Sequence, residues 1–249
     1  MPKARCTAVV LAAGKGSRMG TEEPKQFLHI GGVPVVVCAL TAFQESPLID
    51  EIILVTAREQ IDRCREMAGR YGLDKVVQVI VGGRERYESV WNALKLIKSR
   101  EGAEYVFIHD GARPFVDPDI IERAFLGAEK WGAAVVGMPV KDTIKQVDRE
   151  RIITDSPDRS FLWQAQTPQV FRLSLIEEAF ERQMKEDCSL ITDDAMVVQR
   201  QTGVRACMVE GSYENIKITT PEDMCVAEAF LQRRNSLSNK RSKKDQKRD

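Results

Sequence analysis

The sequence of 249 residues lacks the features that mark membrane-bound, exported or nucleic-acid-binding proteins. No apolar run approaches the roughly 18 residues of a membrane-spanning helix, and no signal-peptide pattern opens the chain. Lysine plus arginine and aspartate plus glutamate each total 37, so the basic excess of a nucleic-acid-binding protein is missing. We therefore expect a cytoplasmic protein that engages neither a membrane nor nucleic acid.

Cysteine and histidine are also scarce. The six cysteines are scattered and none forms a C-x-x-C pair, so neither a zinc site nor a redox motif is indicated. Cys6, Cys38 and Cys225 stand in apolar stretches and are expected to be buried thiols. Only two histidines occur, His29 and His109, and a structural role is expected for His109 at the end of an apolar run.

What the chain does contain is a regular alternation of short apolar runs and helical patterns. Hydrophobic residues make up 43% of the sequence, enough for a sizeable core. Short continuous apolar runs are typical of parallel strands buried on both faces. We therefore predict an α/β fold with a Rossmann-like open, mostly parallel sheet flanked by helices. The predicted strands are Thr7–Ala13, Glu51–Thr56, Lys75–Val81, Tyr105–His109 and Ala133–Val140, and a further strand-like run is VRACMV, residues 204–209.

Capping signals and apolar spacing predict the helices. Asp117 is a good N-cap before Pro118, and Thr192 is interpreted as the cap of a helix that Gly203 ends. The predicted helices begin near Pro34, Ser89, Pro118, Leu173, Asp193 and Pro221.

Two segments fall outside this alternation. Lys141–Asp155 alternates polar and apolar residues, which predicts an extended hairpin or arm over about 139–162. Residues 235–249 are basic and almost free of apolar side chains, so a disordered tail is expected there. Residues 1–234 are interpreted as a single domain.

The most informative stretch is LAAGKGSRMG, residues 11–20, directly after the first predicted strand. Consecutive N–H groups in such a loop can cradle phosphate oxygens. A Rossmann fingerprint fails because Met19 replaces the third glycine and no acid ends the second strand at Thr56. A Walker loop fails because it needs four residues between its glycines, and this loop has one. A nucleotidyltransferase loop and a tight turn without a ligand remain as interpretations.

Neighbouring cations favour the nucleotidyltransferase interpretation. Arg18 lies in the loop, and Lys25 follows within the segment PKQF, residues 24–27. Two positive charges beside small residues suit a phosphate ligand. The residues of this loop expected to bind the nucleotide are Ala12, Ala13, Gly14, Gly16 and Ser17.

A carboxylate is predicted to face the same ligand. The segment HDGARP, residues 109–114, follows a buried strand, and open α/β sheets bind ligands at that end of their strands. Asp110 is suited to border the nucleotide and to hold Mg²⁺ or another divalent cation, directly or through water. Arg113 is expected to contact a substrate phosphate or to organise the loop.

LAAGKGSRM and PKQF together resemble the start of the sugar-phosphate nucleotidyltransferases. Within them the sequence is similar to the 2-C-methyl-D-erythritol 4-phosphate cytidylyltransferase family of the non-mevalonate isoprenoid pathway. The similarity reaches about Phe230, and it is continued by four motifs: GGRERYESV (82–90), WQAQTPQ (163–169), ITDDA (191–195) and NIKIT (215–219). The resemblance implies transfer of CMP from CTP to the phosphate of a small polyol phosphate, with release of pyrophosphate.

The resemblance also implies roles for single residues. Those expected to border the pyrimidine are Gly82, Gly83 and Ser89, although Ser89 would equally suit a helix cap. Those expected to stabilise charge on the α-phosphate, as the catalytic set, are Arg18, Lys25 and Lys217.

The remaining implied residues concern the acceptor. Residues expected to bind it are Arg113, Thr143, Arg159, Thr167 and Thr192. Thr143 and Arg159 lie on the predicted arm, which in this family crosses the interface of a homodimer. For Thr192 the helix-cap interpretation stays open.

Two other functions stay open at this point. A ribitol-5-phosphate cytidylyltransferase shares most of these motifs, and the segment PVKDT, residues 139–143, leans towards methylerythritol phosphate as the acceptor. A non-catalytic nucleotide-binding protein on the same fold would be expected to lose Lys25, Lys217 or Asp110, and all three are present.

Overall fold

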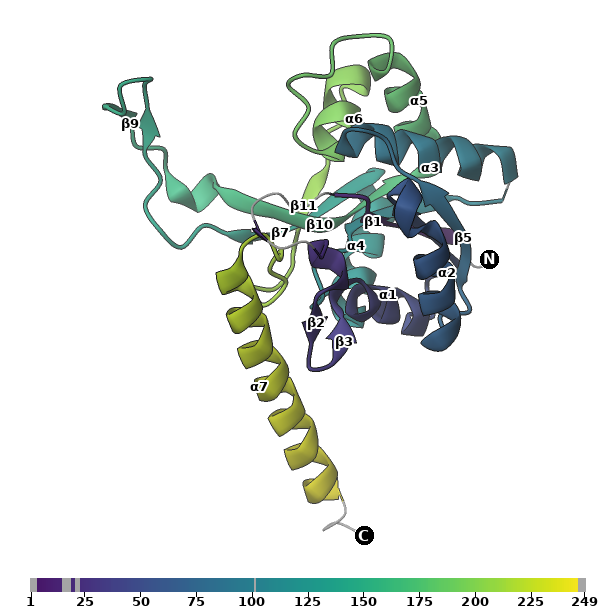
Figure 1. Cartoon of the computed structure of the whole chain (residues 1–249). Coiled ribbons are helices and arrows are strands. Elements are labelled where there is room, and N and C mark those ends of the chain that lie inside the picture. The colour runs from purple at the N-terminus through teal and green to yellow at the C-terminus, as the bar shows by residue number, and fades with distance from the viewer. Residues whose placement is uncertain (1–3, 15–18, 21–22, 101, 246–249) are drawn as a thin grey trace.

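A computed structural model describes residues 4–14, 19–20, 23–100 and 102–245. Its centre is a seven-stranded sheet in the order β11-β7-β10-β6-β1-β4-β5 (Figure 1). All neighbouring strands are parallel except at β10, which is antiparallel to both β6 and β7. These strands are β1 (Cys6–Ala12), β4 (Glu51–Thr56), β5 (Val76–Val81), β6 (Tyr105–Asp110), β7 (Ala133–Pro139), β10 (Trp163–Arg172) and β11 (Cys207–Glu210).

Helices cover both faces of the sheet. Alternate residues of a strand point to opposite faces, so Val10 of β1 packs with one group of helices and Val9 with the other. The first group is α1 (Val35–Glu45), α2 (Ile61–Arg70) and α4 (Pro118–Trp131). The second is α3 (Arg86–Arg100), α5 (Leu173–Gln183) and α6 (Asp194–Thr202). Among the described residues, short 3-10 helices lie in the body at η2 (Lys25–Phe27) and η3 (Arg58–Gln60), and at the end of the arm at η4 (Arg159–Phe161).

The predicted α/β sheet is confirmed, and each of the five predicted strands agrees with the structure to within one residue at either end. β11 overlaps the strand-like run VRACMV, and the strand of this sheet that the sequence did not reveal is β10. Its first half, WQAQ, is polar, and buried apolar side chains appear only at Val170 and Phe171. The run therefore lacks the continuous apolar character by which the other strands were predicted.

Helix caps agree with the sequence at the start of α4 and at the end of α6, where Gly203 has the left-handed conformation, and they differ at the start of α6. The Asp117 carboxylate accepts a hydrogen bond from the backbone N–H of Ile120. At α6 the cap is Asp193, which accepts from Met196 N, and the prediction of Thr192 as the cap is wrong. Asp is at least as good a cap as Thr and stands one residue nearer the first turn.

An arm leaves the sheet between β7 and β10, as the sequence predicted. It carries the short antiparallel pair β8 (Gln146–Val147) and β9 (Ile153–Asp155), and it projects well away from the body (Figure 1). Its side chains are largely exposed, so this chain alone supplies little packing for the arm.

The last helix, α7, spans Pro221–Asp245 and extends beyond the body (Figure 1). The disordered tail expected from residue 235 is therefore helical up to residue 245 in the structure. That segment contains neither proline nor glycine, so nothing in it stops the helix. No helix in the described residues is long and apolar enough to cross a membrane.

The start of α7 packs against a hairpin of β2 (His29–Ile30) and β3 (Val33–Pro34). Ile30, Phe115 and Ile218 are buried there, and Phe230 of α7 meets Phe115 edge to face. Cys225, expected to be a buried thiol, is instead exposed on α7, while Cys6 is buried and Cys38 is half-buried. An apolar neighbourhood in sequence does not settle which side of a helix a residue occupies.

Candidate active site

A pocket opens at the carboxyl ends of β1 and β6, where parallel sheets place their ligand sites. It collects residues from five separate motifs that the sequence assigns to the nucleotide and its phosphates. Its lining residues are Leu11, Ala12, Ala13, Gly14, Lys25, Gln26, Gly83, Arg84, Glu85, Arg86, Ser89, Asp110, Ala112 and Lys217.

Lys25 reaches this pocket because its neighbours are anchored in the core. Gln26 is buried, and its Nε2 donates a hydrogen bond of 2.7 Å to the carbonyl oxygen of Ala12 at the end of β1. Phe27 is also buried, beneath the guanidinium of Arg63. The short helix η2 therefore buries Gln26 and Phe27, and Lys25 lines the pocket. Gln26 is a site residue that the sequence analysis missed.

The loop after β5 also lines the pocket. A Cβ at Gly82 would lie 2.6 Å from the Cβ of Ala13 and 2.8 Å from the Oγ of Ser89, so only glycine allows this approach. Ser89 Oγ accepts from the backbone N–H of Gly83 and donates to the carbonyl of Glu85. Ser89 lies inside α3, so it is not the helix cap, and its hydroxyl shapes the glycine loop.

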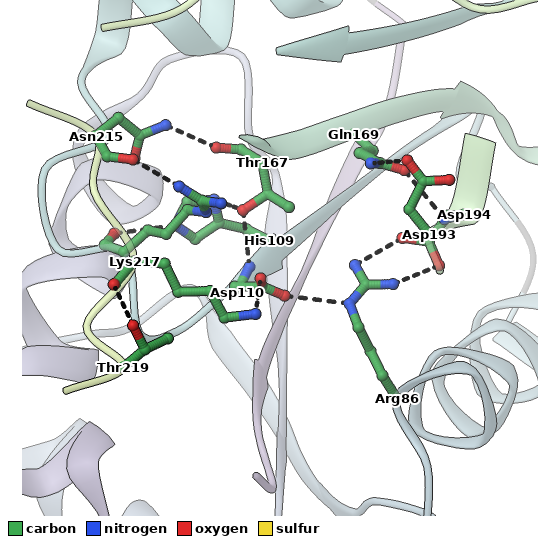
Figure 2. Close-up of polar contacts among 11 residues, drawn as sticks. Arg86, His109, Asp110, Thr167, Gln169, Asp193, Asp194, Asn215, Lys217 and Thr219 are labelled. Atoms are coloured by element: carbon green, nitrogen blue, oxygen red, sulfur yellow. Dashed lines mark hydrogen bonds and ion pairs between the residues drawn. The ribbon is translucent and has the colours of Figure 1, made fainter. Parts of the chain in front are cut away.

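Asp110 lies at the centre of a charge cluster (Figure 2). Its Oδ2 accepts from Lys217 Nζ at 2.7 Å, and its Oδ1 accepts from Arg86 Nε at 3.2 Å. Arg86 in turn donates from both terminal nitrogens to Asp194, at 2.8 Å each. Arg86 lies within the motif GGRERYESV, where the sequence predicts no role for it, and the structure shows that it joins two buried carboxylates.

Burial and neighbouring charges shift the pKa values of these two carboxylates in opposite directions. For Asp110, burial favours the neutral form, but the charges of Arg86 and Lys217 outweigh it and hold the pKa well below the usual range. For Asp194, burial raises the pKa and the single cation Arg86 offsets this only in part. Asp110 is therefore the firmly ionised carboxylate of the site.

A network of buried hydrogen bonds, called the polar lattice below, supports the cluster on the side away from the pocket. Thr167 Oγ1 accepts from the backbone N–H of Asp110 at 3.0 Å and lies 3.1 Å from His109 Nδ1. His109 Nε2 lies 3.1 Å from the carbonyl oxygen of Arg113, and the Arg113 guanidinium donates to the carbonyl of Asn215 at 2.7 Å. Burial lowers the pKa of His109 to about 4, so the imidazole is neutral at physiological pH. These contacts agree with the structural role predicted for His109.

Comparison with known proteins decides the family. A family model described as 2-C-methyl-D-erythritol 4-phosphate cytidylyltransferase matches residues 6–233. The chain belongs to this cytidylyltransferase family. A protein of the same name from Lachnospira eligens is 47% identical over 226 residues, which cover 90% of this chain and 98% of the relative.

Solved structures agree with this family in both fold and extent. A 4-diphosphocytidyl-2C-methyl-D-erythritol synthase from Anaerococcus prevotii matches with a TM-score of 0.81 and 29% identity, covering 92% of this chain and 99% of that one. A 2-C-methyl-D-erythritol 4-phosphate cytidylyltransferase from Francisella tularensis matches with a TM-score of 0.74 and 31% identity, covering 90% and 98%. The nucleotidyltransferase fold therefore extends over nearly the whole chain.

Not every residue implied by the family resemblance lies at the pocket. Gly16, Ser17 and Arg18 fall outside the described residues. Thr167 and Arg113 lie behind Asp110, in the polar lattice, and do not line the pocket. In this cytidylyltransferase, Thr167 contacts the pocket residue Asp110, and the Arg113 side chain contacts Asn215.

The other predicted acceptor residues lie further away. Thr143 and Arg159 are exposed on the arm, where Arg159 Nη1 donates to the carbonyl of Lys141. Thr192 lies in an adjoining pocket beyond Arg86, between α3 and the loop before α6. A single chain of this cytidylyltransferase thus does not gather the predicted acceptor residues around the nucleotide pocket.

The described residues contain no group of three or more His, Cys, Asp or Glu side chains that would hold a metal ion alone. Mg²⁺ at nucleotide sites is commonly held by one or two carboxylates together with the substrate phosphates. Asp110, ionised and lining the pocket, supplies one such carboxylate. The donor set therefore fits a metal that arrives with the nucleotide.

Proposed function

We propose that this protein transfers the CMP group of CTP to the phosphate of 2-C-methyl-D-erythritol 4-phosphate, giving 4-diphosphocytidyl-2-C-methyl-D-erythritol and pyrophosphate. The observation that carries the proposal is the pocket in which Lys25, Lys217 and Asp110 meet beside two glycine loops. The names of the relatives point to the same reaction. We further propose that residues 1–234 act as one catalytic domain.

In the proposed mechanism an oxygen of the acceptor phosphate attacks the α-phosphorus of CTP in line with the departing pyrophosphate. A new P–O–P linkage forms as the bond between the α- and β-phosphates breaks. The acceptor phosphate is already ionised at neutral pH, so no strong general base is required. The barrier lies in bringing two anions together and in the charge that builds on the α-phosphate, and positioned cations lower it.

The cations proposed for this task are Lys25, Lys217 and Arg18. Lys217 is paired with Asp110 in the described structure, and an incoming triphosphate offers it a stronger anionic partner. The residues proposed to border the nucleotide are Ala12, Ala13, Gly14, Gly16, Ser17, Gly82, Gly83, Ser89 and Asp110.

Asp110 is the residue that would hold Mg²⁺ or another divalent cation. The metal would supply charge neutralisation to the triphosphate. The pairing of Asp110 with Lys217 and Arg86 keeps this carboxylate ionised before the nucleotide arrives.

We propose that the acceptor site is completed by a second copy of the chain. The arm exposes apolar side chains that a monomer leaves in water, and Phe161 is 83% exposed. A homodimer formed through the arms would cover them and bring Thr143 and Arg159 towards the partner's pocket. The proposed acceptor residues are Arg113, Thr143, Arg159, Thr167 and Thr192.

Light scattering tests this dimer. The wild-type protein is expected to have twice the chain mass at micromolar concentration, and Phe161→Ser should shift it towards monomer. Leu126→Ser is the matched control, because Leu126 is an exposed apolar residue on α4, away from the arm. A wild-type protein that is monomeric throughout would contradict the shared-arm proposal.

The reaction is tested by pyrophosphate release with Mg²⁺ and CTP, comparing methylerythritol phosphate with ribitol phosphate as acceptor. Release only with methylerythritol phosphate is the expected result. Release only with ribitol phosphate would keep the mechanism and change the substrate. Release with neither acceptor, in a folded sample that binds CTP, would favour a non-catalytic nucleotide-binding protein. We also propose a cytoplasmic location, which the free cysteines support.

A further inference from the structure

The segment that carries Lys217 has no regular secondary structure, yet one fully buried side chain fixes it. Between β11 and α7 the chain forms no helix or strand. Within it, Asn215 has no exposed surface. Its Nδ2 donates to Gln166 Oε1 at 3.1 Å. The same Nδ2 donates to the carbonyl oxygen of Thr167 at 2.9 Å (Figure 2). The amide thus ties an irregular segment to strand β10 of the main sheet.

Asn215 also contacts the loop after β6. Its backbone carbonyl accepts from Arg113 Nη1 at 2.7 Å. Three residues later, Ile218 is buried and its N–H donates to the carbonyl of Ala112 at 2.8 Å. Lys217 therefore starts from a backbone that is anchored on both sides, although its own side chain is only partly covered.

The same contacts lead back to the counter-ion of Lys217. Thr167, whose carbonyl receives the Asn215 amide, accepts the backbone N–H of Asp110 at its hydroxyl. Asp110 Oδ2 then accepts from Lys217 Nζ at 2.7 Å. One closed set of contacts, running through Asn215 and Thr167, therefore positions both Lys217 and Asp110.

We propose that Asn215 is a positioning residue for nucleotidyl transfer, which holds Lys217 where charge builds on the α-phosphate. This inference rests on the proposed function, because Asn215 acts only through Lys217 and lies outside the pocket lining. A lysine ammonium on a four-carbon stem has many rotamers, so fixing its backbone removes much of the search for the productive position.

The test compares Asn215→Ala with wild type by pyrophosphate release, at a temperature where circular dichroism shows every variant folded. We expect kcat to fall roughly 10- to 100-fold and the KM for CTP to change much less. The loss should be smaller than the roughly 10²–10³ seen when a preorganised donor itself is removed, because Lys217 is still present. Tyr213→Phe is the matched control. It removes a hydrogen bond from the same segment, but that bond joins Pro139 at the base of the arm, and activity should stay at the wild-type level.

A double variant separates positioning from a general packing role. Asn215→Ala added to Lys217→Ala should cause no further loss of kcat, because the group that it positions is gone. A further loss of equal size in that background, or a wild-type kcat in Asn215→Ala alone, would overturn the proposal. If Asn215→Ala does not fold, Gln166→Ala removes one of the two acceptors of the amide and should lower kcat in the same direction by a smaller factor.

The outcomes also distinguish this inference from the proposed function. A wild-type protein that releases no pyrophosphate would refute the function itself. An active wild type with a strongly impaired Lys217→Ala and an unimpaired Asn215→Ala would refute only the role of Asn215.

Discussion

Asp110 and Asp194 are carboxylates of one cluster, but their surroundings give them different chemistry. Asp110 faces two cations and lines the pocket, whereas Asp194 is buried behind Arg86 and accepts both of its terminal nitrogens. Arg86 therefore neutralises Asp194 while leaving its Nε for Asp110. At the scale of single residues, the site depends on how these few charges are shared.

Lys25→Ala is expected to lower kcat by roughly 10²–10³, because it removes one preorganised cation from the α-phosphate. The fold should persist, since Gln26 and Phe27 anchor the segment independently of the ammonium group. Pyrophosphate release and circular dichroism measure the two effects. Lys95→Ala, on the exposed side of α3, is the control, and near-normal turnover in Lys25→Ala would contradict the assignment.

Arg86→Lys is expected to reduce both stability and activity, although the charge is kept. A lysine cannot present the planar fork that meets both oxygens of Asp194, and a buried carboxylate then loses a partner. We expect a loss of about 1–3 kcal/mol in the free energy of unfolding, measured with urea. Arg65→Lys is the control, because its pair with Asp62 is exposed and should contribute almost nothing. Equal stabilities of the two variants would contradict this role.

How far the sequence reveals these residues depends on how local the signal is. Lys25, Asp110 and Lys217 follow recognisable local motifs, and each lines the pocket. The partnership of Arg86 with Asp194 spans 108 positions, so no spacing within a motif could reveal it. Gln26 was missed for a different reason, because a polar residue next to a lysine gives no sign that its amide will be buried.

At the scale of elements, the difference between local and long-range signals also separates the predicted strands from β10. The five predicted strands are largely continuous apolar runs, so the sequence alone reveals them. β10 is polar where it enters the arm and contributes Thr167 and Gln166 to the lattice around the site. Recognising β10 as a strand requires its pairing with β6 and β7, and no local pattern in the sequence places these strands beside it.

The contact between α7 and the β2–β3 hairpin is tested by two neighbouring glycines. Gly31 and Gly32 both have positive φ, but a Cβ on Gly31 would lie 2.2 Å from Leu231 Cδ2, whereas nothing lies within 4 Å of one on Gly32. Alanine at either position should cost roughly 1–2 kcal/mol for the left-handed backbone. Gly31→Ala should cost about 1 kcal/mol more, because Leu231 must move. Equal urea midpoints would show that α7 does not pack on the turn.

At the scale of the whole molecule, the buried imidazole of His109 makes stability depend on pH. Burial lowers the pKa of His109 from 6.5 to about 4, so between these values the unfolded chain binds more protons than the native one. Stability therefore rises with pH across this interval and is lost as pH falls. Asp110, whose pKa is held far below its usual range, stays ionised throughout.

The expected contribution of His109 is about 1.5 kcal/mol of unfolding free energy lost between pH 6.5 and 5. Urea unfolding of wild type and His109→Gln at both pH values measures it. The variant should be less stable at pH 6.5 but should lose less on acidification, and the difference between the two slopes isolates the imidazole. Parallel slopes would contradict a neutral His109.

The insertion of β10 between β6 and β7 also orders the assembly of the chain in time. Strands β1, β4, β5 and β6 pair among themselves, so this half of the sheet is complete once residue 110 has been synthesised. β7 follows at residues 133–139, but its partners are β10 and β11, and the first of these begins at residue 163. A nascent chain that ends anywhere in the arm therefore carries one unpaired apolar strand, and this strand cannot dock until the arm has been made.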